Sequence, residues 1–202
     1  MKGLILKDLY MIKKYCMMLI LMVIIFAVVS AVNDGAIFTV YPVMLAGLVP
    51  STLIAYEERA KWDVYSSILP VKKSDIVIEK YIVSLGGILG AVILVCAAHS
   101  VKLAAAGVFS LSALFSFSVV LISVSMIGPV IVLPFTFGLG LEKGRLVYYF
   151  AVGAVCAMAV IMSSVELPSI SIPSIIVLLF DAAVVAGSAF VSVKLYEKRE
   201  LA

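Results

Sequence analysis

Long runs of apolar residues alternate with short polar segments along the 202-residue chain. A helix needs about 20 apolar residues to cross the ~30 Å hydrocarbon core of a bilayer. Turn-forming and helix-breaking residues separate the runs, so each run is expected to form its own membrane-spanning helix. Six spans are predicted, at residues 16–32, 36–55, 76–98, 108–133, 146–162 and 174–193.

The amino-acid composition supports a membrane protein. The chain is 64% hydrophobic and only 13% charged, whereas roughly a quarter of the residues in a soluble domain are charged. The expected fold class is therefore all-α, a polytopic membrane protein with one transmembrane domain over residues 16–194 and a short tail at 195–202. A net charge of +3 gives no indication of a nucleic-acid partner.

The lysines and arginines predict the orientation of these spans. With six spans both termini lie on the same side of the membrane, together with the polar segments at 56–75 and 138–145. Every lysine and arginine except Lys102 falls on that side. Because positively charged loops stay in the cytoplasm, both termini are predicted to be cytoplasmic in a multi-pass protein of the cell membrane.

Residues 1–15 are predicted to form an amphipathic helix along the membrane surface. The lysines share one side of the helical wheel, and an apolar arc interrupted by Asp8 occupies the other. The apolar arc contains Leu4, Ile5, Leu9, Met11, Ile12 and Tyr15. Membrane lipid is the partner expected for this elbow helix. A cleavable signal peptide ending near Ala31 is the rival interpretation, although the apolar run is longer than usual for one.

An unusually polar segment lies between the second and third predicted spans, where residues 56–81 hold ten charged side chains. Residues 57–69 contain no Gly or Pro and place Trp62, Tyr65 and Leu69 on one helical face. A short helix lying crosswise under the membrane is predicted. Its aromatic side chains either anchor at the level of the headgroups or, surrounded by charges of both signs, form the centre of a protein docking surface.

Motifs for catalysis, nucleotide binding and metal binding are absent from the sequence. No GxxxxGK[ST] segment is present to hold phosphates, and the single histidine, His99, rules out HExxH. The three cysteines are scattered through apolar runs without CxxC spacing. No catalytic residue, metal site or bound cofactor is expected in this chain, and any ATP must be held by another one.

Asp181 lies inside the last predicted span, seven residues or ~10 Å from Ser174. It recurs with Ser174, Ser188 and Ser192 in a polar stripe at helical spacing. The stripe either lines a translocation path or locks neighbouring helices together by hydrogen bonds. In the fourth span Pro129 is predicted to kink the helix, which makes it a candidate for gating, and Pro134 to end it.

The charged segment resembles that of the compact type-2 ATP-binding-cassette (ABC-2) permeases of Gram-positive bacteria. The residues that carry this resemblance are Glu57, Trp62, Ser66, Leu69, Pro70, Val71, Lys80 and Tyr81. The resemblance implies that residues 57–69 are a coupling helix that docks on a separate cytoplasmic ATPase subunit. Its docking residues would be Glu57, Glu58, Arg59, Trp62, Asp63, Tyr65, Ser66 and Leu69.

The same resemblance implies a function. The chain would be the permease subunit of an ATP-driven exporter, paired with a second permease, identical or paralogous, and with ATPases that bind ATP and Mg²⁺. It is similar to exporters of amphipathic peptides such as the phenol-soluble-modulin systems. The alternatives are a permease for a drug, a lipid or a peptide antibiotic in an immunity system, and an ATP-independent carrier. A membrane-embedded enzyme is disfavoured because the sequence shows no catalytic motif.

Overall fold

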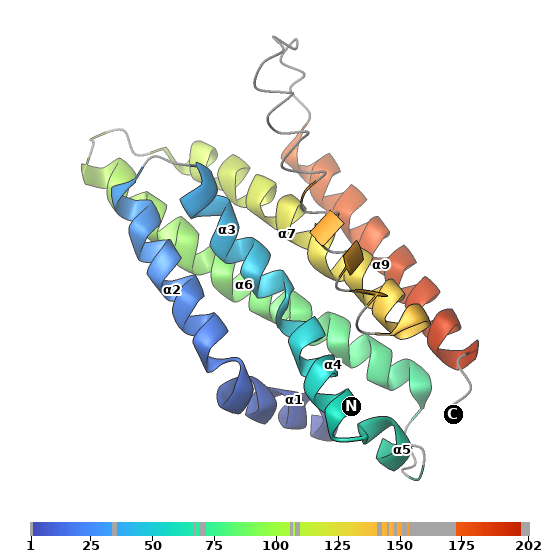
Figure 1. Ribbon diagram of the computed structural model, residues 1–202. Coiled ribbons are helices and arrows are strands. Elements are labelled where there is room, and N and C mark those ends of the chain that lie inside the picture. The colour runs from blue at the N-terminus through green and yellow to red at the C-terminus, as the bar shows by residue number, and fades with distance from the viewer. Residues whose placement is uncertain are drawn as a thin grey trace.

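The regular elements of the described residues are all helices, seen in the computed structural model in Figure 1. The structure describes residues 2–33, 36–66, 68, 72–105, 107, 110–140, 143–144, 146–147, 149–150, 153 and 173–198. The helices are α1 (Lys2–Tyr15), α2 (Met17–Val32), α3 (Ala36–Gly47), α4 (Val49–Arg59), α5 (Trp62–Ser66), α6 (Lys73–Ala105), α7 (Leu111–Leu139) and α9 (Ser174–Lys198). This confirms the all-α class.

Four stretches among the described residues are long and apolar enough to cross a membrane, namely Phe38–Arg59, Lys73–Ala105, Leu111–Gly138 and Ser174–Lys198. They correspond to the second, third, fourth and sixth predicted spans. A fifth is reached if the bent pair of α1 and α2 counts as one span. The predicted span at 146–162 lies largely outside the described residues, as do residues 199–202 of the tail.

The long helices run side by side, and both ends of the chain lie at the same end of the bundle (Figure 1). Helices α1 and α5 lie at that end too (Figure 1). Helix α1 meets α2 at a bend of 72°, with Cys16 buried at the junction. Residues 2–15 therefore form a helix set at an angle to α2, and the role of this helix as an elbow stays a prediction. Its position at the membrane surface stays a prediction.

A buried apolar cluster anchors α1 to the rest of the bundle. Its members come from α1, α6, α7 and α9, and they are Leu4, Ile76, Val77, Tyr81, Leu133, Phe137 and Tyr196. A second cluster, of Cys16, Val49, Leu53 and Val83, joins the α1–α2 bend to α4 and α6. Because α1 contributes to the first cluster and its Met11 and Ile12 pack on the second, one side of this helix faces protein.

The predicted coupling helix at 57–69 is wrong as a single element. Helix α4 continues from the second span to Arg59, and the chain then breaks at Lys61, whose φ of 52° is left-handed. Only Trp62–Ser66 forms the separate helix α5. Leu69, the last predicted residue, lies outside the described part of the chain. The break separates the charged end of α4 from the aromatic residues of α5.

Helix α7 does not end at Pro134 as predicted but continues to Leu139. Pro134 lacks the N–H that would bond to the carbonyl of Val130 four residues earlier. The Ser188 hydroxyl from α9 donates to that carbonyl at 2.8 Å. A neighbouring helix therefore satisfies the group that the proline leaves free, which allows α7 to continue.

The end of α3 and the middle of α7 are in backbone contact. A Cβ at Gly128 would lie 3.2 Å from the carbonyl oxygen of Gly47 and 3.3 Å from its Cα. A Cβ at Gly47 would in turn lie 3.2 Å from the carbonyl oxygen of Ser125, which Pro129 deprives of its helical partner. Small residues at both positions thus permit this close packing.

We expect Gly128→Ala to destabilise the protein because the added methyl group meets backbone that cannot rotate aside. Overpacking of this kind costs about 1–3 kcal/mol. The matched control is Gly187→Ala on α9, where a Cβ meets nothing within 4 Å. Thermal unfolding in detergent should show a lower midpoint for the first variant only. Equal midpoints for the two variants would contradict the close contact of α3 and α7.

Candidate functional site

Helices α1, α4 and α6 bring four oppositely charged side chains together at the end of the bundle that holds α5. Lys80 of α6 is fully buried, as is Asp8 of α1, and Glu57 of α4 is 7% exposed. The Lys80 Nζ lies 2.7 Å from the Asp8 Oδ2 and 2.7 Å from the Glu57 Oε1. Asp8 and Glu57 lie 72 and 23 positions before Lys80 in the sequence, and both pair with its ammonium group.

Lys7 is the fourth member of this ion cluster, which we define as Lys7, Asp8, Glu57 and Lys80. Its Nζ lies 3.3 Å from the Asp8 Oδ1 and also pairs with the Glu57 carboxylate. Burial disfavours the charged form of Lys7, but the carboxylate of Glu57, with a smaller effect from Asp8, outweighs burial and raises the pKa of Lys7. Two ammonium groups therefore face two carboxylates.

The cluster constrains three helices because its charges are out of water. A buried ion pair adds little net stability when intact, but removing one partner leaves an uncompensated charge and costs about 3–5 kcal/mol. Any movement that separates α1, α4 and α6 carries a cost of the same origin. The three helix ends should therefore move together as one rigid unit.

Glu79 lies beside the cluster and differs from its members. It is fully buried on α6, and neither carboxylate oxygen has a hydrogen-bond partner among the described residues. The two lysines nearby are already paired with Asp8 and Glu57. Glu79 is therefore a buried carboxyl group beyond the balanced set of four.

Trp62 connects α5 to the ion cluster. The Lys7 Nζ lies 4.2 Å from the centre of the Trp62 ring, within the range of a cation–π interaction. Trp62 also packs against the apolar cluster that contains Leu4 and Ile76. The Tyr65 ring lies 5.7 Å from the Trp62 ring and is 60% exposed. Helix α5 thus holds one aromatic side chain inward and presents the other outward.

The predicted docking residues separate into two groups in the structure. Glu58, Arg59 and Tyr65 are exposed, whereas Glu57 and Ser66 are buried. Trp62 is partly buried, Asp63 lies within α5, and Leu69 is outside the described residues. Glu58, Arg59 and Tyr65 are therefore accessible to a partner, whereas Glu57 faces into the protein.

The predicted polar stripe on α9 makes contacts between helices. The Ser123 hydroxyl of α7 donates to the Asp181 Oδ2 at 2.5 Å. Ser188 and Ser192 lie 2.7 and 2.8 Å from the Tyr81 hydroxyl of α6. These contacts favour the interpretation of the stripe as a helix lock over that of a translocation path.

The other two residues proposed for a path lie at different places. Ser174 begins α9 and is half-buried. Pro129 is buried inside α7, where its Cδ would lie 3.7 Å from a Cβ at Gly47. In the described part of the chain, no group of three or more His, Cys, Asp or Glu side chains is arranged to hold a metal ion. The site consists of ion pairs and hydrogen bonds between helices.

Sequence reasoning missed the ion cluster although its signals were present. Asp8 interrupts the apolar arc of residues 1–15, which places a carboxylate on the side of α1 that faces protein. Glu79 and Lys80 fall inside the predicted span 76–98, where ionisable residues seldom lie without a partner. The interpretation of the spans considered Asp181 and did not consider Glu79 or Lys80.

We expect Lys80→Met to destabilise the protein strongly because Asp8 and Glu57 then lose their buried cation. The expected cost is about 3–5 kcal/mol. Glu79→Gln should leave the thermal midpoint unchanged or raise it, since the side chain has the same shape and no ion pair is lost. Lys72→Met, at an exposed lysine, is the control for loss of charge. A Lys80→Met protein as stable as this control would show that the ion pairs do not hold the helices together.

Comparison with known protein families matches residues 3–197 to the family described as ABC-2 family transporter protein. Searches of curated proteins and of solved structures gave no significant match. The family match covers nearly the whole chain, from the start of α1 to the end of α9, and agrees with the apolar spans. This chain therefore belongs to the ABC-2 family of transporter proteins, the membrane-spanning components of ATP-binding-cassette transporters.

Proposed function

We propose that this chain is the permease subunit of an ATP-driven exporter and that the segment from Glu58 to Tyr65 receives the force of a cytoplasmic ATPase. The observation that carries the proposal is the connection from α5 through Trp62 and Lys7 to the buried ion cluster. An exposed surface element is thereby joined to the ends of α1, α4 and α6. Membership of the ABC-2 family supports an ATPase partner.

The exposed side of this segment has the composition of a docking surface. Tyr65 is 60% exposed, and Ile68, which follows the segment, is 80% exposed. Glu58 and Arg59 supply charges of opposite sign. Apolar and aromatic side chains anchor protein interfaces, and charges at the rim steer association. The partner ATPase would hold ATP and Mg²⁺, because this chain has no phosphate-binding motif.

The ion cluster would convert docking into movement of the spans. ATP binding can shift the transporter between states only by its difference in affinity for them, and a compliant joint would dissipate the displacement locally. The break at Lys61 allows α5 to be displaced as a separate piece. The Trp62–Lys7 contact and the cluster then transmit the displacement to the elbow and to the second and third spans together.

The same proposal includes a second permease subunit and an amphipathic peptide as substrate. One apolar face of α9 is exposed, including Ile175, Leu179, Phe180 and Phe190, each at 62% or more. That face suits either lipid or another permease, and a single subunit of this size would supply half of a path. The membrane-spanning helices are apolar and carry scattered serines. Such surfaces suit an amphipathic peptide that leaves the inner leaflet better than a strongly hydrophilic solute.

We expect the double substitution Tyr65→Ala with Ile68→Ala to reduce recovery of the ATPase at least tenfold. Two exposed anchors at a docking surface together account for more than about 1.4 kcal/mol, which corresponds to that factor. Co-expression with candidate ABC ATPases followed by affinity purification measures the effect. Tyr10→Ala, at an exposed tyrosine on α1 (68%), is the matched control. Undiminished recovery with the double variant would refute docking through α5.

Substitutions of Asp181 test whether the polar stripe on α9 serves transport or helix packing. Asp181→Asn retains an oxygen that can accept from Ser123, so we expect assembly and thermal midpoint to be preserved. If the stripe only locks helices, Asp181→Asn should transport normally and Asp181→Ala should unfold at a lower temperature. Reduced peptide export by Asp181→Asn in proteoliposomes with the ATPase bound would instead identify a role of the charge in transport.

A further inference from the structure

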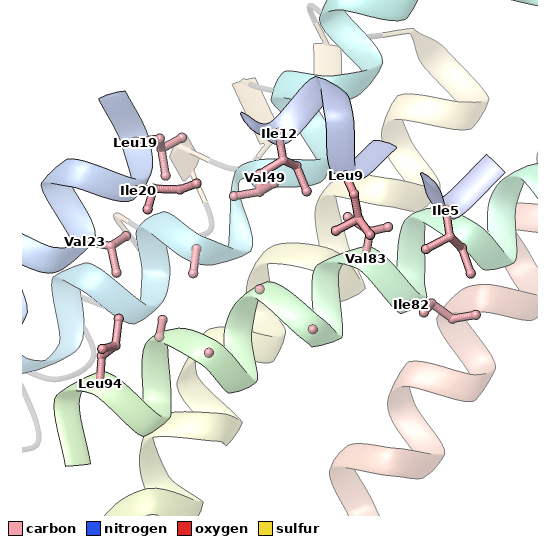
Figure 2. Close-up of a pocket in the computed structure, with 15 residues that line it drawn as sticks. Ile5, Leu9, Ile12, Leu19, Ile20, Val23, Val49, Ile82, Val83 and Leu94 are labelled. Atoms are coloured by element: carbon pink, nitrogen blue, oxygen red, sulfur yellow. The ribbon is translucent and has the colours of Figure 1, made fainter. Parts of the chain in front are cut away.

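An apolar groove lies between α1, α2 and α6. Its volume is about 490 Å³, and residues from all three helices and the α3–α4 junction line it. Figure 2 shows Ile5, Leu9 and Ile12 pointing from α1 toward α6, where Ile82 and Leu94 mark the extent of the groove. The floor is formed by Gly86, Gly87, Gly90 and Ala91.

The dimensions of the groove fit one extended chain. Ile82 and Leu94 are twelve residues apart on α6, which is ~18 Å along the helix. A cavity of about 490 Å³ that extends over this length has room for one extended hydrocarbon chain.

Along α6 the groove is about as long as one membrane leaflet is deep. Helix α6 is one of the spans, and the groove extends from the level of α1 along this span. Half of a ~30 Å hydrocarbon core is ~15 Å, close to the ~18 Å between Ile82 and Leu94. A chain that enters beside α1 would therefore end near the middle of the bilayer, as the acyl chain of a lipid does.

A positive charge lies next to the groove on α1. Lys13 follows Leu9 by four residues, so the two side chains lie on the same side of the helix. Leu9 lines the groove, and Lys13 is exposed. An ammonium group above an apolar groove is complementary to a lipid with a negatively charged headgroup, and each lysine near such a surface contributes about 1 kcal/mol.

We propose that this groove binds one acyl chain of an anionic phospholipid whose phosphate is held by Lys13. The bound chain fills the space under the elbow and packs α1 against α6. Lipid would thus support the helix that carries Lys7 and Asp8 through the groove-lining residues Ile5, Leu9 and Ile12. This binding does not depend on docking of an ATPase or on the identity of the exported substrate.

The test is titration of the purified full-length protein in detergent with phosphatidylglycerol or phosphatidylcholine. Thermal unfolding should shift upward by about 5 °C or more at a hundredfold excess of phosphatidylglycerol over Kd. Native mass spectrometry should detect one retained phosphatidylglycerol. Phosphatidylcholine should give a smaller shift. An equal response to the two lipids would overturn the role of the headgroup charge.

Gly86→Leu with Gly90→Leu fills the groove from its floor. A Cβ at either position meets nothing within 4 Å, and leucine is the better helix former, so the variant should fold. We expect it to lose both the phosphatidylglycerol-dependent shift and the retained lipid. Gly187→Leu on α9, equally free of contacts, is the matched control and should keep both. A groove-filled variant that responds like the control would overturn the proposed site.

The substitution Lys13→Gln tests the contact with the lipid headgroup independently of the contact with the acyl chain. We expect its affinity for phosphatidylglycerol to fall about fivefold, equivalent to ~1 kcal/mol for one lysine, with little change for phosphatidylcholine. Lys198→Gln, at an exposed lysine in the last turn of α9, is the control for net charge. Equal losses in the two variants would show that general surface charge, and not Lys13, attracts the lipid.

Discussion

The buried pairing of Lys80 with Asp8 and Glu57 is the interaction on which the arrangement of the elbow depends. An ammonium group without exposure to water requires compensating carboxylates at hydrogen-bonding distance, and these come from two other helices. Helix α1 therefore has to lie across the ends of α4 and α6, whatever its preference for the membrane surface. One side of its amphipathic pattern is satisfied by contact with protein.

The same pairing accounts for the path of the chain after the second span. Glu57 must reach Lys80, so α4 stays helical beyond the apolar run and ends at Arg59. The chain then turns at Lys61, and α5 begins with Trp62 beside Lys7. The charges that hold α1 thus also position α5, the proposed docking element. Under the proposed function, coupling and folding depend on the same atoms in this region.

The sequence was sufficient to predict the fold class, a helix before the first span and four of the six spans, because apolar run length and breaker residues are local signals. It was insufficient to predict the left-handed backbone at Lys61, since nothing in the neighbouring residues requires it. It was also insufficient to predict that α7 continues past Pro134, because this depends on the distant hydroxyl of Ser188. Asp8 was visible as an interruption, but its buried partner Lys80 lies 72 residues away. For Pro134 and Asp8 the deciding contact is with a residue distant in the sequence and not a local propensity.

The polar interactions of the bundle differ in strength along its length. Near α5 the helices are joined by buried ion pairs, whereas α9 is joined to α6 and α7 by hydrogen bonds. These involve the hydroxyls of Tyr81, Ser188 and Ser192 and the bond from Ser123 to the Asp181 carboxylate. Hydrogen bonds between membrane helices are worth about 0.6 kcal/mol on average, well below the cost of exposing one member of a buried ion pair. A displacement that reaches α5 therefore meets a stiff joint first and a weaker one beyond it. This order is what a transmission element needs, because α1, α4 and α6 can move together while their contacts with α9 rearrange.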